Sequence, residues 1–80
     1  MRLNIVKLLK VIKVKIQEIV GKNIKKYRLQ KKLTQEELAE ICDLHRTYIS
    51  SIERGIKSPS LNILFRISNE LEINIKNLFE

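Results

Sequence analysis

The segment from Thr34 to Gly55, TQEELAEICDLHRTYISSIERG, constrains the fold of this chain more than any other. Its pattern predicts two short helices joined by a tight turn. Thr34 and Glu37 have the S/T-x-x-E spacing of a capping box, in which each side chain accepts the backbone amide of the other residue. Asp43 falls at the turn, where Asp tolerates a left-handed backbone better than most residues. Ala39 is small enough to let two helices cross steeply.

Helical periodicity continues on both sides of this segment. Residues 16–31 predict one helix, and residues 45–54 and 61–71 predict two more. Ser60 and Asn74 are candidate caps, the second for a last short helix that ends at Leu78 and Phe79. The residues expected to face the core are Ile16, Val20, Ile24, Tyr27, Leu38, Ala39, Ile41, Ile49, Ile52, Leu61, Leu64, Ile67 and Leu71. The expectation is therefore an all-α domain.

The first fifteen residues, MRLNIVKLLKVIKVK, are interpreted as a basic extension that precedes the domain of residues 16–80. Apolar residues recur here at spacings of four, three, four and three, which places them on one side of a helix. This apolar stripe consists of Ile5, Leu9, Ile12, Ile16 and Ile19. Residues 12–16 also alternate between apolar and basic, as a strand would. We favour a helix that either extends the next helix or frays at its start.

Charge is unevenly distributed along the chain. Its 80 residues, 44% of them hydrophobic, suit one small domain with a net charge of +7. Residues 1–32 carry 11 Lys or Arg against one acidic residue, whereas residues 33–80 carry 5 against 8. A basic arm beside a mildly acidic domain favours a polyanionic partner, which is either nucleic acid or an anionic membrane surface.

The sequence lacks the residues that several classes of function require. The single cysteine, Cys42, forms no internal disulfide and is expected to be buried among apolar neighbours. One His and one Cys build no metal cluster, and the sequence has neither a glycine-rich loop nor a paired acid and base for catalysis. No apolar run is long enough to span a bilayer, and the N-terminus is a poor signal peptide. We expect a cytoplasmic protein that is not an enzyme.

The helix expected over residues 45–54 has one apolar and one polar side. Ile49 and Ile52 form its buried seam, which leaves Arg46 and Thr47 pointing outward. An arginine can donate two hydrogen bonds to guanine O6 and N7, and a threonine offers a hydroxyl and a methyl group to base edges. Ser51, one turn further on, stays close to the same surface. Such a helix suits the major groove of DNA.

The run from Val20 to Glu80 resembles the lambda-repressor-like helix-turn-helix family of the XRE type. Within that family, LHRTYISSIERG looks most like the small controller proteins of restriction–modification systems. The resemblance implies a compact five-helix domain that binds a palindromic operator in double-stranded DNA as a homodimer. We expect no cofactor, no metal ion and no small-molecule ligand. In controllers, the targets are usually the controller's own gene and the neighbouring endonuclease gene.

The resemblance also implies roles for individual residues. Residues implied to contact DNA are Gln35 and Ser58 on phosphates, Arg46, Thr47 and Ser51 on bases, and Tyr48 and His45 beside them. Arg28 and Glu53 match a structural pair that joins the first helix to the third. The apolar residues Ile73, Ile75, Leu78 and Phe79 are assigned to a two-fold dimer interface.

The chain also departs from the family pattern. Glycine usually stands where this chain has Lys32 and Asp43, and Ser or Asp usually stands where it has His45. The cap of the recognition helix is therefore expected to be weak, unless His45 contacts a phosphate instead.

Two other functions fit parts of the same sequence. An antitoxin or a phage-type repressor would use the same scaffold. A membrane-surface protein would instead use residues 1–20 as a basic amphipathic helix on anionic lipid.

Overall fold

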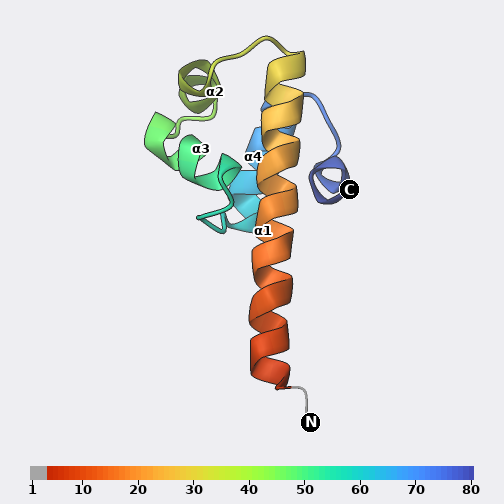
Figure 1. Ribbon diagram of the computed structural model, residues 1–80. Coiled ribbons are helices and arrows are strands. Elements are labelled where there is room, and N and C mark those ends of the chain that lie inside the picture. Colours follow the sequence, from red (N-terminus) through yellow and green to blue (C-terminus); the bar gives the residue numbers. More distant parts are fainter. Residues whose placement is uncertain (1–3) are drawn as a thin grey trace.

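Helices form all the regular secondary structure of the computed structural model, which describes residues 4–80. Four are α-helices: α1 (Ile5–Gln30), α2 (Gln35–Ile41), α3 (Arg46–Glu53) and α4 (Leu61–Glu70). The C-terminal segment η1 (Ile75–Phe79) is a 3₁₀-helix. Helices α2, α3 and α4 and the segment η1 surround the C-terminal half of α1, while the N-terminal half projects away from them (Figure 1). The molecule is therefore elongated, with extents of 48 × 23 × 20 Å.

The expectation of a fifth α-helix is corrected to a short 3₁₀-helix. Asn74 caps it as expected, because its side chain accepts the amide of Lys76 at 3.0 Å. The Asn77 side chain accepts the Asn74 amide in return. With only five residues, the segment is of the length at which i→i+3 hydrogen bonds are common.

The helix α1 is continuous through the expected boundary between residues 15 and 16. Asn4 caps its first turn by accepting the amide of Val6 at 2.9 Å. Residues 12–16 are helical rather than extended, so the strand alternative does not hold for them. The first three residues of the expected extension lie outside the described part of the chain.

The core lies where the four α-helices and η1 meet. Its buried apolar members are Val20, Ile24, Leu38, Ala39, Cys42, Ile49, Ile52, Leu64, Ile67, Leu71 and Leu78. The expected burial of the Ile49–Ile52 seam and of Cys42 is confirmed. Three predictions are wrong, because Ile16, Ile41 and Leu61 are 45%, 45% and 69% exposed. Ile41 and Leu61 stand at helix ends, and Ile16 lies at the edge of the domain, where periodicity does not reveal whether a neighbour covers the side chain.

A left-handed residue follows the C-cap of each of the four α-helices. Lys32, Asp43 and Glu72 have φ values of 58°, 55° and 58°, and Gly55 has φ of 73°. The amide of the residue after each left-handed residue donates to a carbonyl in the last turn of the helix, as Leu33 N does to the Arg28 carbonyl at 3.1 Å. These are Schellman motifs, which satisfy carbonyls that the helix leaves open. The departures from glycine at Lys32 and Asp43 therefore keep the turn that glycine would have made.

The capping box expected at the start of α2 is present. The Thr34 hydroxyl accepts the Glu37 amide, and the Glu37 carboxylate accepts the Thr34 amide, both at 3.0 Å. Donation from the Thr34 amide lowers the pKa of the Glu37 carboxyl, and the bond to the Thr34 side chain lowers it further. Ser60 caps α4 in the simpler way, since its hydroxyl accepts the Ile63 amide.

Gly21 marks the closest approach of α1 to α3. A Cβ atom on this residue would lie 2.7 Å from the Glu53 carbonyl oxygen and would also overlap the Ile52 carbonyl. Only glycine lets the two backbones approach so closely.

We predict that Gly21→Ala lowers the free energy of unfolding by about 1–3 kcal/mol, because the added methyl group forces α1 away from α3. Urea unfolding followed by circular dichroism measures this change. Lys25→Ala is the control, since Lys25 is exposed on the same helix. An unfolding free energy of Gly21→Ala equal to that of the wild type would contradict the close approach.

The thiol of Cys42 has no exposed surface. Burial, with a smaller contribution from the nearby Glu70 carboxylate, raises its pKa from 9.0 to about 11. The thiol is therefore neutral at physiological pH and a poor nucleophile.

We predict that the stability advantage of the wild type over Cys42→Ala falls as the pH rises from 9 to 11. The unfolded chain loses the thiol proton first, so the contribution of the neutral buried thiol is complete below pH 9 and declines above it. Urea unfolding at pH 8 and pH 11 measures the advantage. A difference that does not change with pH would show that the thiol is not held neutral.

Candidate nucleic-acid interface

Helix α3 carries the polar surface that the sequence singles out. Its buried side is formed by Ile49 and Ile52, which are 0% and 1% exposed. Its C-terminal end approaches α1 at Gly21, so its N-terminal end points away from the body of the domain (Figure 1). Arg46 and Thr47 are exposed at that outer end. The polar residues thus stand on a helix whose other side is fixed by the core.

His45 is the N-cap residue of α3, so this helix begins at Arg46, one residue later than expected. The His45 side chain makes no hydrogen bond to the cap and is exposed. The first amides of a helix have no partner within the helix, and here the capping side chain does not satisfy them. The outer end of α3 therefore offers backbone donors as well as the positive end of the helix dipole.

Tyr48 and Ser51, which are also expected to contact DNA, are less exposed than Arg46 and Thr47. Tyr48 is half-buried and packs against the core. Ser51 is also half-buried, and its hydroxyl donates to the Thr47 carbonyl at 2.9 Å. The Ser51 oxygen still has lone pairs that can accept a hydrogen bond.

Arg28 and Glu53 form a buried ion pair between α1 and α3. Nε of Arg28 donates to Oε2 of Glu53 at 2.7 Å, and Nη2 of Arg28 donates to Oε1 of Glu53 at 2.9 Å. The two side chains are only 7% and 3% exposed. The remaining guanidinium nitrogen donates to the Leu33 carbonyl at 2.8 Å. This bidentate geometry is the strongest arrangement for such a pair, and it fixes α3 against α1 and the following loop.

Gln35 belongs to the same network. Its side-chain nitrogen donates to Oε1 of Glu53 at 3.1 Å, and the residue is half-buried. Sequence reasoning missed this contact, since nothing in the sequence indicates that residue 35 reaches residue 53. The second hydrogen on the Gln35 nitrogen and the amide oxygen are not used by this bond.

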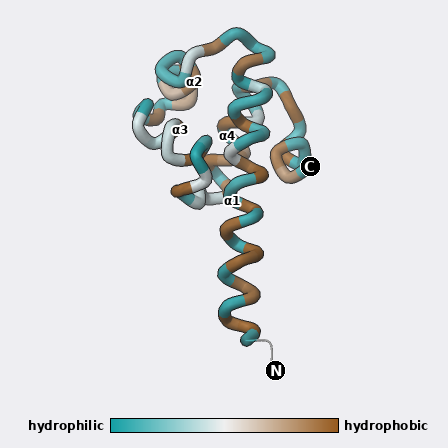
Figure 2. Tube along the Cα trace, viewed as in Figure 1, coloured by the Kyte–Doolittle hydropathy of each residue, from teal (hydrophilic) through white to brown (hydrophobic). Residues whose placement is uncertain are grey.

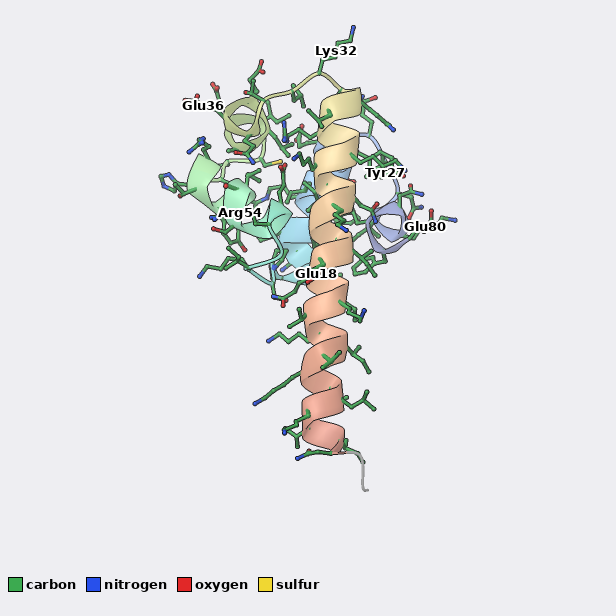
Figure 3. All side chains as sticks on the ribbon, viewed as in Figure 1. Glu18, Tyr27, Lys32, Glu36, Arg54 and Glu80 are labelled. Carbon is green, nitrogen blue, oxygen red and sulfur yellow. The ribbon has the colours of Figure 1, made fainter. Side chains whose placement is uncertain are left out.

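The loop after α3 holds Ser58, which is exposed. Two exposed cations, Arg54 and Lys57, precede it. Sequence reasoning did not single them out, although their position just after the polar helix α3 was a usable signal. Figure 3 shows Arg54 at the end of α3 that lies near α1.

The four residues assigned to a dimer interface do not share one environment. Leu78 is completely buried in the core of a single chain, so the assignment is corrected for this residue. The Asn23 side chain holds it there by donating to the Leu78 carbonyl at 2.9 Å. Ile73 and Ile75 are half-buried, and Phe79 is 46% exposed.

Within residues 4–80, no group of three or more His, Cys, Asp or Glu side chains is arranged to hold a metal ion. No helix in that part of the chain combines the length and the apolar content that crossing a bilayer requires.

Comparison with known proteins places this geometry among helix-turn-helix proteins, whose family profile matches residues 24–78. The chain is 44% identical over 66 residues to control protein C.BamHI of Bacillus amyloliquefaciens, an alignment that covers 81% of this chain and 82% of that protein. The restriction–modification controller protein C.AhdI of Aeromonas hydrophila has a similar structure, with a TM-score of 0.76, 32% identity, and coverage of 79% of this chain and 96% of that one.

A third similar protein was solved bound to DNA. It is SinR, described as the master regulator for biofilm formation, with a TM-score of 0.73 and 35% identity. The superposition covers 76% of this chain and 98% of that one.

We predict that Arg28→Met lowers the free energy of unfolding by about 3–5 kcal/mol, because it leaves the Glu53 carboxylate buried without its cation. Thermal and urea unfolding measure this loss. Lys31→Met is the matched control, since it breaks an ion pair of similar length, 2.8 Å to Glu72, whose side chains are 38% and 76% exposed. The control should change stability little. Equal losses in the two variants would contradict the structural role of the buried pair.

Proposed function

The chain belongs to the helix-turn-helix family, and on this premise we propose that it is a transcriptional regulator that recognises a specific sequence in double-stranded DNA. The main observation behind this proposal is that Arg46 and Thr47 are exposed at the outer end of α3, whose opposite side is packed into the core. An interface that reads base edges needs side chains held in a defined register. The network of Arg28, Glu53 and Gln35 supplies that rigidity.

Each polar residue then has a role that follows from its place. Arg46 donates to guanine O6 and N7, and Thr47 contacts a neighbouring base edge. His45 and the open amides at the start of α3 contact phosphate. Tyr48 and Ser51 make supporting contacts from their half-buried positions. Gln35 uses its unbonded amide hydrogen on a phosphate, and Ser58 contacts the backbone from the loop.

Charge restricts how the duplex approaches. The exposed side of α2 carries Glu36, Glu37 and Glu40, which repel phosphates. The duplex therefore meets the domain at the outer end of α3 and at the first residue of α2, rather than along the length of α2. Arg54 and Lys57 add attraction that does not depend on sequence.

The regulator acts in the cytoplasm as a homodimer on a palindromic operator. A two-fold dimer places one α3 in each of two half-sites, about 34 Å apart along the duplex. The exposed ring of Phe79 and the half-buried Ile73 and Ile75 contribute to the contact between subunits. The similarity to C.BamHI and C.AhdI over about four fifths of this chain supports a controller of restriction–modification genes. The protein needs no cofactor and carries out no catalysis.

The proposal is tested first with the DNA upstream of its own gene. Fluorescence anisotropy against a scrambled duplex, at two salt concentrations, separates specific from non-specific binding. We expect a preference for the upstream DNA that survives at the higher salt concentration. Equal affinity for the two duplexes would refute sequence recognition, and a preference only for a toxin or phage promoter would favour the antitoxin or repressor alternative.

We predict that Arg46→Ala costs on the order of 1–3 kcal/mol of binding to the operator and relaxes the preference at one base pair. Anisotropy with a set of single-base operator variants measures both effects. Lys76→Ala, which removes one exposed positive charge from η1, is the charge-matched control and should leave the base preference unchanged. A uniform loss of affinity across all operator variants would instead assign Arg46 to phosphate.

A further inference from the structure

The projecting half of α1 leaves an apolar surface uncovered. Exposed fractions range from 41% to 70% along the apolar stripe of Ile5, Leu9, Ile12, Ile16 and Ile19. Their spacing of four, three, four and three is the a/d pattern of a coiled coil, so they face one direction. Within residues 4–80, no other element packs against the first three of them (Figure 1). Five large aliphatic side chains in one row are more than a solvated helix face needs.

The C-terminal segment covers the upper end of this same stripe. Asn23 is the next residue in the row, four after Ile19, and its side chain donates to the Leu78 carbonyl at 2.9 Å and to the Glu80 carbonyl at 3.2 Å. Below this contact a shallow groove is lined by the apolar residues Ile16, Val20, Pro59, Leu61, Leu64 and Phe79, with Gln17 and Ser58 as its polar members. The stripe and η1 therefore form an apolar corner, which suits a rod-shaped partner better than a flat bilayer.

Lysines, interspersed with exposed Val11 and Val14, occupy the other sides of the projecting helix. Apolar and polar residues alternate in every turn of this part (Figure 2). Most of its nitrogen-tipped side chains point to the side on which α3 lies, away from the C-terminal segment (Figure 3). Lys7 and Lys10 take the outermost positions of the a/d pattern, where a partner helix would leave them in water.

The residues that flank the apolar stripe are compatible with an antiparallel pair of identical helices. Val6 and Leu8 flank its first half, and Lys13 and Lys15 flank its second half. An antiparallel second copy sets Lys13 beside Val6 and Lys15 beside Leu8, so no two lysines oppose each other. The lysine stems then cover the edges of the apolar seam while the ammonium groups remain in water.

The position of η1 favours the same orientation. In a parallel pair, both copies of η1 would stand on the facing sides of α1 at the same height and would force the helices apart. In an antiparallel pair, the free N-terminal end of one α1 comes to lie below η1 of the other. Ile5 of one copy then faces Ile16 of the other, next to the groove at Phe79 and Leu61.

We infer that two copies of this chain associate through the apolar stripe of α1, as an antiparallel two-helix pair with Leu9 opposite Ile12 and Ile5 opposite Ile16. The inference does not require DNA. It extends the contact between subunits from the C-terminal segment to the N-terminal part of α1, residues 5–19, which lies outside the family match that begins at residue 24.

Sedimentation velocity on the full chain, without DNA, tests the inference. The stripe variant Leu9→Gln/Ile12→Gln is compared with Val11→Gln/Val14→Gln on the lysine-bearing side of the same helix. The first pair is 59% and 44% exposed and the second is 52% and 49% exposed, so the two variants remove similar apolar surface. We expect the dimer dissociation constant to rise at least tenfold for the stripe variant only. Equal constants for all three proteins would overturn the inference.

These substitutions lie outside the core, and circular dichroism checks that helix content and melting temperature are kept. Orientation is measured by disulfide cross-linking of mixed single-cysteine chains, in which Cys42 is replaced by Ala. Ile5→Cys should cross-link to Ile16→Cys and not to itself, and Val14→Cys should do neither. Self-cross-linking of Ile5→Cys, or no cross-linking at all, would overturn the antiparallel pair.

Vesicles rich in phosphatidylserine provide the competing outcome. If the stripe variant loses binding to these vesicles while its dissociation constant stays unchanged, then lipid rather than a second copy covers the stripe, and the inference is wrong. The DNA proposal stands or falls separately, because it is measured by the preference of Arg46 variants for operator DNA.

Discussion

The buried ion pair between Arg28 and Glu53 is the contact on which the arrangement of this domain depends. It joins α1 to α3, and the bonds to the Leu33 carbonyl and to Gln35 extend it to the loop and to the first residue of α2. Burying two charges is unfavourable unless their hydrogen bonds are satisfied, and here both carboxylate oxygens are engaged. Apolar packing alone would let α3 rotate about its seam. The ion pair selects one orientation of the helix, and with it the direction in which Arg46 and Thr47 point.

The ends of the helices are the second constraint. Helices of seven and eight residues, such as α2 and α3, are marginal in isolation and need tertiary packing and defined ends. The C-cap of each α-helix is followed by a left-handed residue that reverses the chain within a few positions. The connections are therefore short, and the open carbonyls are satisfied without buried loops. Because the connections are short, eighty residues suffice to enclose one core around the C-terminal half of α1.

Two surfaces of opposite character remain after the core is formed. The outer end of α3 is polar and suits a charged, hydrated partner, whereas the projecting half of α1 offers an apolar stripe that suits another helix. They stand on different elements, but the Arg28–Glu53 pair and the close approach at Gly21 connect those elements rigidly. A second copy held along α1 would therefore fix the relative placement of two α3 helices, which is the geometry that an operator with two half-sites requires.

Local signals in the sequence determined the helices, their caps and the polar and apolar sides of α3. The capping box at Thr34, the caps at Ser60 and Asn74 and the seam of Ile49 and Ile52 depend on residues at most four positions apart, so periodicity and capping chemistry suffice. Only the tertiary structure decided what covers each face. It exposed Ile16, Ile41 and Leu61, buried Leu78 and joined Gln35 to Glu53, because a repeating pattern defines a direction around a helix but not the neighbour that lies there.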